Sequence, residues 1–328
     1  MLTDTFHRVH DYLRISITDQ CNFRCAYCMP GHIFGEHYRF SKNQMSPDEI
    51  FELASVFHRL GVNKIRVTGG EPLVRSDAGA ILLRLSALPV KLTITTNASL
   101  VHRHINDLKA SGLRSVNISL DSLEADAFRI ITERDQFNVV MNNIGMLLDE
   151  GFRVKVNMVV LKGNNDHEVS RFVEWTRDRE LHVRFIEYMP FAFNGWTQDL
   201  VVPMDDLIER ISNVFQIEKL EDRPNDTARN FRVKGYSGTF AFIATMSHPF
   251  CSTCNRLRIT ADGKLKNCLF SSAETDLLTP LRKGEDIEHL IRQTVTAKKA
   301  SRGGQMEDAL EFIDADKISN RSMIAIGG

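Results

Sequence analysis

The stretch Cys21-Asn-Phe-Arg-Cys25-Ala-Tyr-Cys28 sets three cysteines within eight residues, separated by three and by two positions. So short a loop closes at small entropic cost, so all three thiols can turn toward one small object. Structural zinc takes four protein ligands, but this stretch offers only three thiolates. An iron–sulfur cube held by three thiolates keeps one iron open to a further ligand. The stretch therefore favours an iron–sulfur cluster, with a structural zinc knot or three incidental buried thiols as alternatives.

Around this stretch, short β-branched runs alternate with segments of helical period. The capping box Ser46-Pro-Asp-Glu49 predicts the start of one such helix, and apolar residues follow it on one face. Six units of this kind predict parallel strands with right-handed crossovers, and six rather than eight predict an incomplete (βα)6 barrel. The predicted strands are Tyr12–Thr18, Lys64–Thr68, Lys91–Thr95, Arg114–Leu120, Arg153–Val160 and His182–Met189.

Alternation within these strands separates apolar from polar side chains. In the first strand Leu13 and Ile15 face one side and Arg14 the other, and Arg66 and Lys155 hold the equivalent polar positions in later strands. If the apolar side meets the helices, the barrel has a polar lumen that carries three cations. Enclosed cations repel one another unless an anion joins them, so the lumen predicts a polyanionic ligand. The alternative is that these side chains reach solvent at an open sheet edge.

Gly69-Gly70-Glu71-Pro72 directly follows the second predicted strand. The glycines let the backbone approach a ligand closely, and Glu71 can accept a hydrogen bond from a bound ammonium, although the segment alone could be a tight turn. Together with the cysteine motif it resembles the radical S-adenosylmethionine (SAM) enzymes. The resemblance implies that Cys21, Cys25 and Cys28 hold a [4Fe–4S] cluster. It also implies a SAM site formed by Tyr27, Gly70, Glu71, Ser119 and Met189.

The βα rhythm ends near Pro190, where glycine and proline become frequent. We therefore expect a radical SAM barrel at 1–189 and a second, α+β region at 190–328. Within the second region, residues 232–234 and 239–246 flank a short glycine-containing turn and predict a hairpin. A basic run at Lys298, Lys299 and Arg302 predicts a solvated face.

A second cysteine set, Cys251-x2-Cys254-x13-Cys268, lies in the α+β region. A zinc ribbon with His248 as fourth ligand is one interpretation. Against it stands the segment that follows the second cysteine, because Arg256 and Arg258 share one face of a predicted strand. Two guanidinium groups beside a metal suit a phosphate or a purine edge better than a structural knot.

The two cysteine sets and the Asn-Arg-Leu-Arg segment together resemble the GTP 3',8-cyclase family over nearly the whole chain. In that family SAM is cleaved to methionine and a 5'-deoxyadenosyl radical, which removes hydrogen from C3' of GTP. The C3' radical then attacks C8, and one electron and one proton complete (8S)-3',8-cyclo-7,8-dihydro-GTP, in the first step of molybdenum cofactor biosynthesis. The resemblance implies a second [4Fe–4S] cluster on Cys251, Cys254 and Cys268. It also implies catalytic roles for Arg14, Arg256 and Arg258. The implied GTP contacts are Arg14, Arg66, Thr95, Lys155, Arg256, Leu257 and Arg258.

The family also implies an active-site role for the last residues, Met323-Ile-Ala-Ile-Gly327-Gly328, which otherwise would be a frayed end. It further implies a downstream cyclic pyranopterin monophosphate synthase and an electron donor such as flavodoxin or ferredoxin. A monomer or homodimer is expected. A radical SAM peptide maturase and a non-catalytic iron–sulfur sensor or electron carrier are the alternatives, but neither explains the cationic lumen.

Composition agrees with a globular protein. In 328 residues, 41 basic and 42 acidic side chains give a net charge of -1, so no global field draws the chain to nucleic acid or membrane. No apolar run has the length of a membrane span or a signal peptide, and a cytoplasmic location is expected. Six cysteines in two groups of three favour metal binding over disulfides.

Overall fold

One twelve-stranded sheet forms the centre of the described chain. The computed structural model describes residues 1–29, 43–191, 194–306 and 313–327. The strands are β1 Tyr12–Ser16, β2 Lys64–Thr68, β3 Lys91–Thr96, β4 Ser115–Ser119, β5 Arg153–Val160, β6 Leu181–Glu187, β7 Ile217–Lys219, β8 Arg229–Val233, β9 Thr239–Ile243, β10 Arg256–Ile259, β11 Lys264–Lys266 and β12 Thr275–Asp276. Their order in the sheet is β12-β11-β10-β1-β2-β3-β4-β5-β6-β9-β8-β7.

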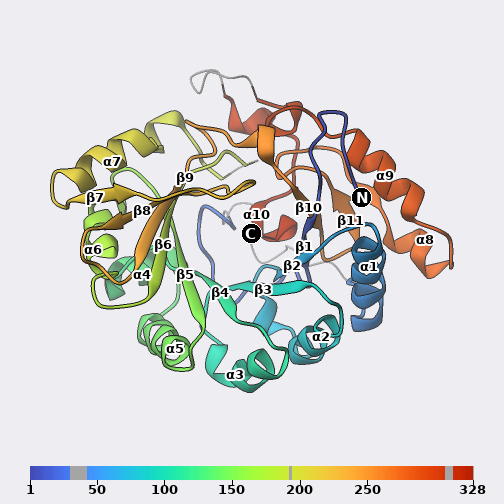
Figure 1. The fold of residues 1–328 in the computed structure, drawn as a ribbon, viewed down its shortest axis with the longest axis horizontal. Helices are drawn as coiled ribbons and strands as arrows, with labels where there is room; N and C mark the ends of the chain where they lie inside the picture. Colours follow the sequence, from blue (N-terminus) through green and yellow to red (C-terminus); the bar gives the residue numbers. More distant parts are fainter. Residues whose placement is uncertain (30–42, 192–193, 307–312, 328) are drawn as a thin grey trace.

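The six predicted strands are confirmed as β1 to β6, all parallel to their neighbours. Strands of the C-terminal half extend them on both sides, because β10 pairs parallel with β1 and β9 pairs parallel with β6. In the described sheet β9 and β10 are not neighbours, so the parallel strands curve into an open arc (Figure 1). The incomplete barrel is therefore confirmed, whereas the division at residue 189 stays a prediction.

Helices cover the convex side of this arc, with α1 to α6 outside it and α10 near its centre (Figure 1). The capping box of α1 is confirmed: Glu49 donates from its backbone to Ser46 Oγ at 3.2 Å, and Ser46 donates to the Glu49 carboxylate at 2.7 Å. None of the described helices is long and apolar enough to cross a membrane. The helices are α1 Pro47–Arg59, α2 Ala78–Leu85, α3 Val101–Ala110, α4 Ala125–Thr132, α5 Phe137–Asp149, α6 Val169–Glu174, α7 Met204–Ser212, α8 Leu278–Arg282, α9 Glu288–Thr296 and α10 Met323–Ile326.

The core lies between the convex face of the sheet and the helices. Leu13, Ile15 and Ile65 are buried there, as the strand parity predicts, and Phe57 of α1 packs into the same cluster. The predicted hairpin is also confirmed, as the antiparallel pair β8 and β9. Burial of the apolar face stabilises the arc and leaves its concave face to the polar side chains.

A smaller apolar cluster joins the segment after β6 to the end of the chain. Tyr188, Trp196, Phe270 and Ile326 are all buried in it. Trp196 Nε1 donates to the carbonyl of Tyr188 at 3.0 Å, which gives the buried indole N–H its partner. Through this cluster, Ile326 of α10 packs against the segment after β6 and against the region around Phe270.

Candidate active site

The concave face of the arc carries the predicted cations. Arg14, Arg66 and Lys155 line one cavity of about 960 Å³, together with Lys64 and Arg184. Burial, followed by the charge of Arg184, lowers the pKa of Lys155 to about 8. Burial and Arg66 lower the pKa of Arg184 to about 9. The cations therefore destabilise one another in this space, as expected of a site built for an anion.

Several buried polar atoms on these strands have no hydrogen-bond partner among the described residues. They are Tyr12 Oη, Arg66 Nε, Asn157 Oδ1, Arg184 Nε and Thr95 Oγ1. All but Thr95 belong to residues that line the cavity, and Thr95 is in register with Asn117 in the middle of the arc. Buried polar groups are normally paired, so these orphaned atoms indicate a polar ligand.

The two arginines of the Asn-Arg-Leu-Arg segment join this cavity because their segment forms β10. Arg256 lies in register with Tyr12, and Arg258 with Arg14, so Arg14 and Arg258 are neighbours. Burial and Arg256 lower the pKa of Arg258 to about 10. The GTP contact predicted for Leu257 would have to come from its backbone. Its side chain is fully buried beside Leu13, because strand parity turns it toward the apolar core.

Lys64 and Arg184 were not among the residues predicted from the sequence. Lys64 shares the parity of Arg66 in β2, and Arg184 lies at an alternate position of β6 between buried Val183 and Phe185. The same alternation that identifies Arg66 therefore contained the signal. Extending it to the first residue of β2 and to the sixth strand would have found both.

All three cysteines of the second set line the same cavity as the arginines. Each of Cys251, Cys254 and Cys268 is a free, half-buried thiol. Burial alone would raise the pKa of Cys254, but the charges of Arg256 and Lys298 and the hydrogen bonds around the thiol lower it to about 6. A thiolate is the form that binds a metal, so this environment prepares Cys254 for that role.

The basic run that follows α9 is not the solvated face that the sequence predicts. Lys298 is 4% exposed and Arg302 3% exposed, whereas Lys299 is exposed as expected. Lys298 Nζ lies 3.7 Å from Cys254 Sγ, and the backbone N–H of Arg302 lies 3.5 Å from Cys251 Sγ. Lys298 and Arg302 are buried because they lie against the second cysteine set.

The first cysteine set forms a tight loop at the carboxyl end of β1. Backbone N–H groups of Cys28 and Met29 donate to the Cys25 carbonyl at 2.9 and 2.8 Å, and Phe23 N–H lies 3.4 Å from Cys21 Sγ. Burial and the carboxylate of Glu71 raise the pKa of Cys21 to about 11. Burial and Asp121 raise the pKa of Cys25 well above its ordinary value. A thiolate here needs a positive partner, which a metal cluster supplies.

Tyr27 fixes the far side of this loop. Its hydroxyl donates to Asp121 Oδ2 at 2.6 Å, and Asp121 Oδ1 accepts from the backbone of Val159 at 2.8 Å. Burial raises the pKa of Asp121 to about 6 despite these two donors. The aromatic residue of the motif thus ties the cysteine loop to the carboxyl ends of β4 and β5.

The Gly69-Gly70 pair lies where two backbone segments meet. A Cβ on Gly70 would lie 2.4 Å from the carbonyl oxygen of Gln20, and a Cβ on Gly69 would lie 2.7 Å from that of Thr18. Gly70 donates to the Thr18 carbonyl at 2.8 Å. Only glycine fits this approach, which holds the end of β2 against the segment that leads to Cys21.

Glu71 was predicted to accept a hydrogen bond from a bound ammonium, and protein groups hold its carboxylate. The side chain is fully buried, and its oxygens accept from Thr96 Oγ1 at 2.7 Å and from the backbone of Asn97 at 2.6 Å and Leu73 at 3.0 Å. Burial raises its pKa to about 7 in spite of these donors. The carboxyl group therefore links the ends of β2 and β3 and faces the protein interior. Of the other predicted SAM residues, Ser119 ends β4 and Met189 lines the cavity.

The described end of the chain also reaches this site. Met323 lines the cavity, and Ile324 Cγ1 would lie 2.9 Å from a Cβ on Gly70. Arg258 donates from Nη1 to the Gly327 carbonyl at 2.6 Å. Gly327 is thus placed at the arc, while Gly328 lies outside the described residues.

The fourth ligand suggested for a zinc ribbon has another partner. His248, the suggested fourth ligand of a zinc ribbon, instead lies with Nε2 3.0 Å from Asp205 Oδ2. The second cysteine set thus lines a cavity that also contains arginines, and His248 interacts with Asp205 instead of these cysteines.

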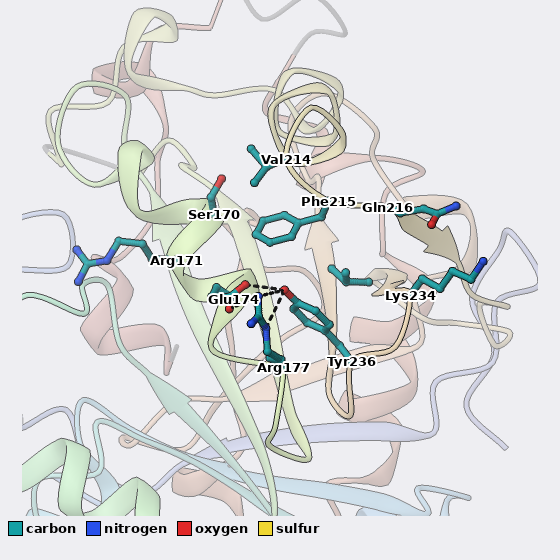
Figure 2. Close-up of a pocket in the computed structure, with 10 residues that line it drawn as sticks. Ser170, Arg171, Glu174, Arg177, Val214, Phe215, Gln216, Lys234 and Tyr236 are labelled. Atoms are coloured by element: carbon teal, nitrogen blue, oxygen red, sulfur yellow. Dashed lines mark hydrogen bonds and ion pairs between the residues drawn. The ribbon is translucent and has the colours of Figure 1, made fainter.

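A second, shallower pocket lies outside the arc, between α6, the end of α7 and the β8–β9 turn (Figure 2). Tyr236 donates to the Glu174 carboxylate at 2.5 Å, and Arg177 lies over the Tyr236 ring and donates to its hydroxyl. None of the predicted site residues lines this pocket, and its charged groups at Glu174 and Arg177 are already paired.

Comparison with known proteins agrees with the geometry. A family model described as the Radical SAM superfamily matches residues 15–176, and one described as Molybdenum Cofactor Synthesis C matches residues 181–303. The Arabidopsis thaliana protein named "GTP 3',8-cyclase, mitochondrial" is 44% identical, over 100% of this chain and 84% of that protein. The chain belongs to the GTP 3',8-cyclase family. The resemblance found in the sequence is thereby confirmed.

Other relatives in the family differ in length. The GTP 3',8-cyclase of Listeria welshimeri is 39% identical, over 100% of this chain and 99% of that protein. Molybdenum cofactor biosynthesis protein 1 of Dictyostelium discoideum is 42% identical, but this chain spans only 52% of its length. The chain thus covers nearly the whole of some relatives in the GTP 3',8-cyclase family and about half of others.

Among solved structures, Streptococcus suis SuiB bound to S-adenosylmethionine superposes with a TM-score of 0.64 at 15% identity. The match covers 86% of this chain and 65% of SuiB. Another SuiB structure holds a precursor peptide. At this identity the similarity to SuiB shows a shared fold and gives no support for a peptide substrate.

Proposed function

We propose that the chain converts GTP to (8S)-3',8-cyclo-7,8-dihydroguanosine 5'-triphosphate, the first step of molybdenum cofactor biosynthesis, with cleavage of SAM to 5'-deoxyadenosine and methionine. One observation carries the proposal most strongly. The lumen cations Arg14, Arg66 and Lys155 and the second cysteine set line a single cavity. A triphosphate would neutralise the charge of these cations. A purine base beside the cysteines would match the cyclisation at C8 of guanine that the family carries out.

Cys21, Cys25 and Cys28 are the proposed ligands of the first [4Fe–4S] cluster. The donor set fits, because three free thiols sit in one short loop with no fourth cysteine nearby to close the site. When bound, this cluster and SAM supply a 5'-deoxyadenosyl radical. Tyr27, Gly70, Ser119 and Met189 are the proposed SAM contacts. Of these, Gly70 packs against Gln20 and so lies beside the segment that leads to Cys21.

The proposed ligands of the second [4Fe–4S] cluster are Cys251, Cys254 and Cys268. They too are free thiols, and the cationic surroundings of Cys254 favour its thiolate. Guanine is proposed to lie beside this cluster. Arg256 and Arg258 support this position because they line the cavity between the cysteines and β1.

The remaining polar groups of the cavity are proposed to bind the ribose and the triphosphate. Lys155, Arg66 and Arg184 offer charge, and the orphaned atoms of Arg66 and Arg184 offer unused donors. Thr95 Oγ1 is a further unused donor near the middle of the arc. These groups hold the nucleotide in one orientation within a lumen sheltered from water, which a radical reaction needs. Arg14 and Arg258, which sit side by side, would contact the reacting nucleotide.

The test is anaerobic reconstitution of the clusters, followed by reduction and addition of SAM and GTP. Mass spectrometry then follows 5'-deoxyadenosine and the nucleotide. The proposal predicts both 5'-deoxyadenosine and a GTP-derived product with the 3',8 bond. Formation of 5'-deoxyadenosine with GTP untouched would leave SAM cleavage standing and remove the substrate assignment.

The competing functions make different predictions in the same experiment. A peptide maturase would bind a precursor peptide in preference to GTP. An iron–sulfur sensor or electron carrier would not cleave SAM after reduction. Neither explains why Arg184 and Lys64 add two further cations to the lumen.

Partners and location remain proposals. An electron donor such as flavodoxin or ferredoxin would supply the reducing equivalents, and a cyclic pyranopterin monophosphate synthase would take the product. A monomer or homodimer is the proposed assembly. The cytoplasmic location also stays a prediction, and the Arabidopsis relative is named as mitochondrial.

A further inference from the structure

Lys298 is an ammonium group enclosed beside the second cysteine set. It follows α9, is 4% exposed, and its Nζ donates to the carbonyl of Arg256 at 3.0 Å. The same Nζ lies 3.7 Å from Cys254 Sγ, within hydrogen-bond range for sulfur. The side chain therefore points its charge at a proposed cluster ligand.

The segment that carries Lys298 is held firmly in place by the start of the chain. Arg8 donates to the carbonyls of Cys251 and Lys299 at 2.8 Å and of Ala300 at 2.9 Å. Arg8 is in turn fixed by Asp4, whose carboxylate lies 2.6 Å from Arg8 Nε, and both side chains are buried. The N-terminal segment thus clamps the cysteine loop to the 298–302 run and keeps Lys298 from turning outward.

The charge of Lys298 is not neutralised by a carboxylate of the described residues. Its hydrogen bonds go to a carbonyl and a thiol. The first cysteine set has a different environment, with the buried carboxyl groups of Glu71 and Asp121 and the guanidinium group of Arg24 nearby.

We propose that Lys298 raises the reduction potential of the cluster held by the second cysteine set. The inference rests on the proposed second cluster. Reduction adds one negative charge to a cluster, and a buried ammonium with an N–H toward sulfur stabilises the reduced form. Lys298 is thus a positioning and tuning residue that does not touch the substrate.

The test uses the full-length chain with Cys21, Cys25 and Cys28 replaced by alanine, so that only the second cluster is reconstituted. Iron and sulfide are counted first, and the potential is then measured by an anaerobic dithionite titration followed by electron paramagnetic resonance. Lys298→Met is expected to shift the one-electron reduction equilibrium at least about tenfold toward the oxidised cluster, which is ~59 mV downward. Lys298→Arg, which restores the charge, is expected to return the potential toward that of the parent.

Lys299→Met is the matched control, because it removes the same charge from the neighbouring, exposed lysine and should leave the potential unchanged. An unchanged potential in Lys298→Met would overturn the inference. So would loss of the cluster from both Lys298→Met and Lys298→Gln, because the side chain would then be needed for assembly. If the parent with three alanines takes up no iron, the proposed second cluster itself fails.

Discussion

Arg258 donates a hydrogen bond from Nη1 to the carbonyl oxygen of Gly327 at 2.6 Å, across 69 positions of sequence. Both partners are buried, and Gly327 has a positive φ of 84°. A Cβ at Gly327 would lie 2.5 Å from Thr68 Oγ1, at the end of β2. The end of the chain is therefore packed against the carboxyl ends of the first strands by an arginine that also faces the proposed GTP site.

Deletion of Gly327 and Gly328 should stop cyclisation without affecting the clusters. The deletion removes the carbonyl that Arg258 binds and opens the packed end of the arc. Iron and sulfide content should match the intact chain, while the yield of the 3',8-cyclised nucleotide should fall at least about tenfold. Full activity of the shortened chain would show that the terminal glycines are a frayed end.

Gly70→Ala should disrupt the SAM site. Its new methyl group would lie 2.4 Å from the backbone oxygen of Gln20, so the backbone must shift. We expect a loss of about 1–3 kcal/mol in unfolding free energy and much less 5'-deoxyadenosine. Gly145→Ala in α5 is the control, because nothing lies within 4 Å of its Cβ position. It should gain roughly 0.5–1 kcal/mol, and equal 5'-deoxyadenosine from the two variants would contradict the account.

Arg184→Met should weaken GTP binding by about 10- to 100-fold, the worth of one charge-assisted hydrogen bond. Its Nε has no partner among the described residues, whereas its Nη2 donates to Asn117 Oδ1, and Arg66 is a cation nearby. Without GTP the variant loses one repelling charge but also leaves the buried Asn117 Oδ1 without its donor, so we expect little net change in its unfolding midpoint. Arg177→Met in the outer pocket of Figure 2 serves as control. Calorimetric titration with GTP and thermal unfolding measure both effects, and an unchanged Kd would remove Arg184 from the site.

The buried His10 should make stability depend on pH. Burial, reinforced by the charge of Lys298, lowers its pKa from 6.5 to about 4. Between these values the unfolded chain binds the proton and the folded chain does not, so stability falls as the pH falls through this window, by up to about 3 kcal/mol.

His10→Gln lacks this titration and should lose less stability than the parent between pH 6.5 and 4. Glutamine keeps an N–H that can reach Asp4, to which His10 Nε2 lies 3.0 Å away. His289→Gln, which changes an exposed histidine of α9, should behave as the parent. Unfolding midpoints measured across this range decide the matter, and parallel losses in all three proteins would refute the assignment.

The arc and its cationic face were predictable because they depend on local patterns. Strand parity alone placed Arg14, Arg66 and Lys155 in one lumen, and the cysteine spacing marked both proposed metal sites. The pairing of β10 with β1 was not predictable in this way, because register between segments more than 200 residues apart depends on the complete fold.

Three residues illustrate the limits of local patterns. Glu71 turns inward because three protein donors at the ends of β2 and β3 take its carboxylate. Lys298 is buried because the N-terminal segment and the second cysteine loop enclose it, which no basic run reveals. The side chain of Leu257 follows the parity rule and belongs to the core, so the predicted GTP contact would use its backbone.

The measurement that bears most directly on the function uses GTP carrying deuterium at C3'. This nucleotide and unlabelled SAM are added to the reconstituted, reduced protein, and the mass of the 5'-deoxyadenosine is measured by mass spectrometry. Transfer of hydrogen from C3' predicts 5'-deoxyadenosine that is one mass unit heavier, together with a cyclised nucleotide that has lost that deuterium. Unlabelled 5'-deoxyadenosine from a reaction that consumes GTP would contradict the account.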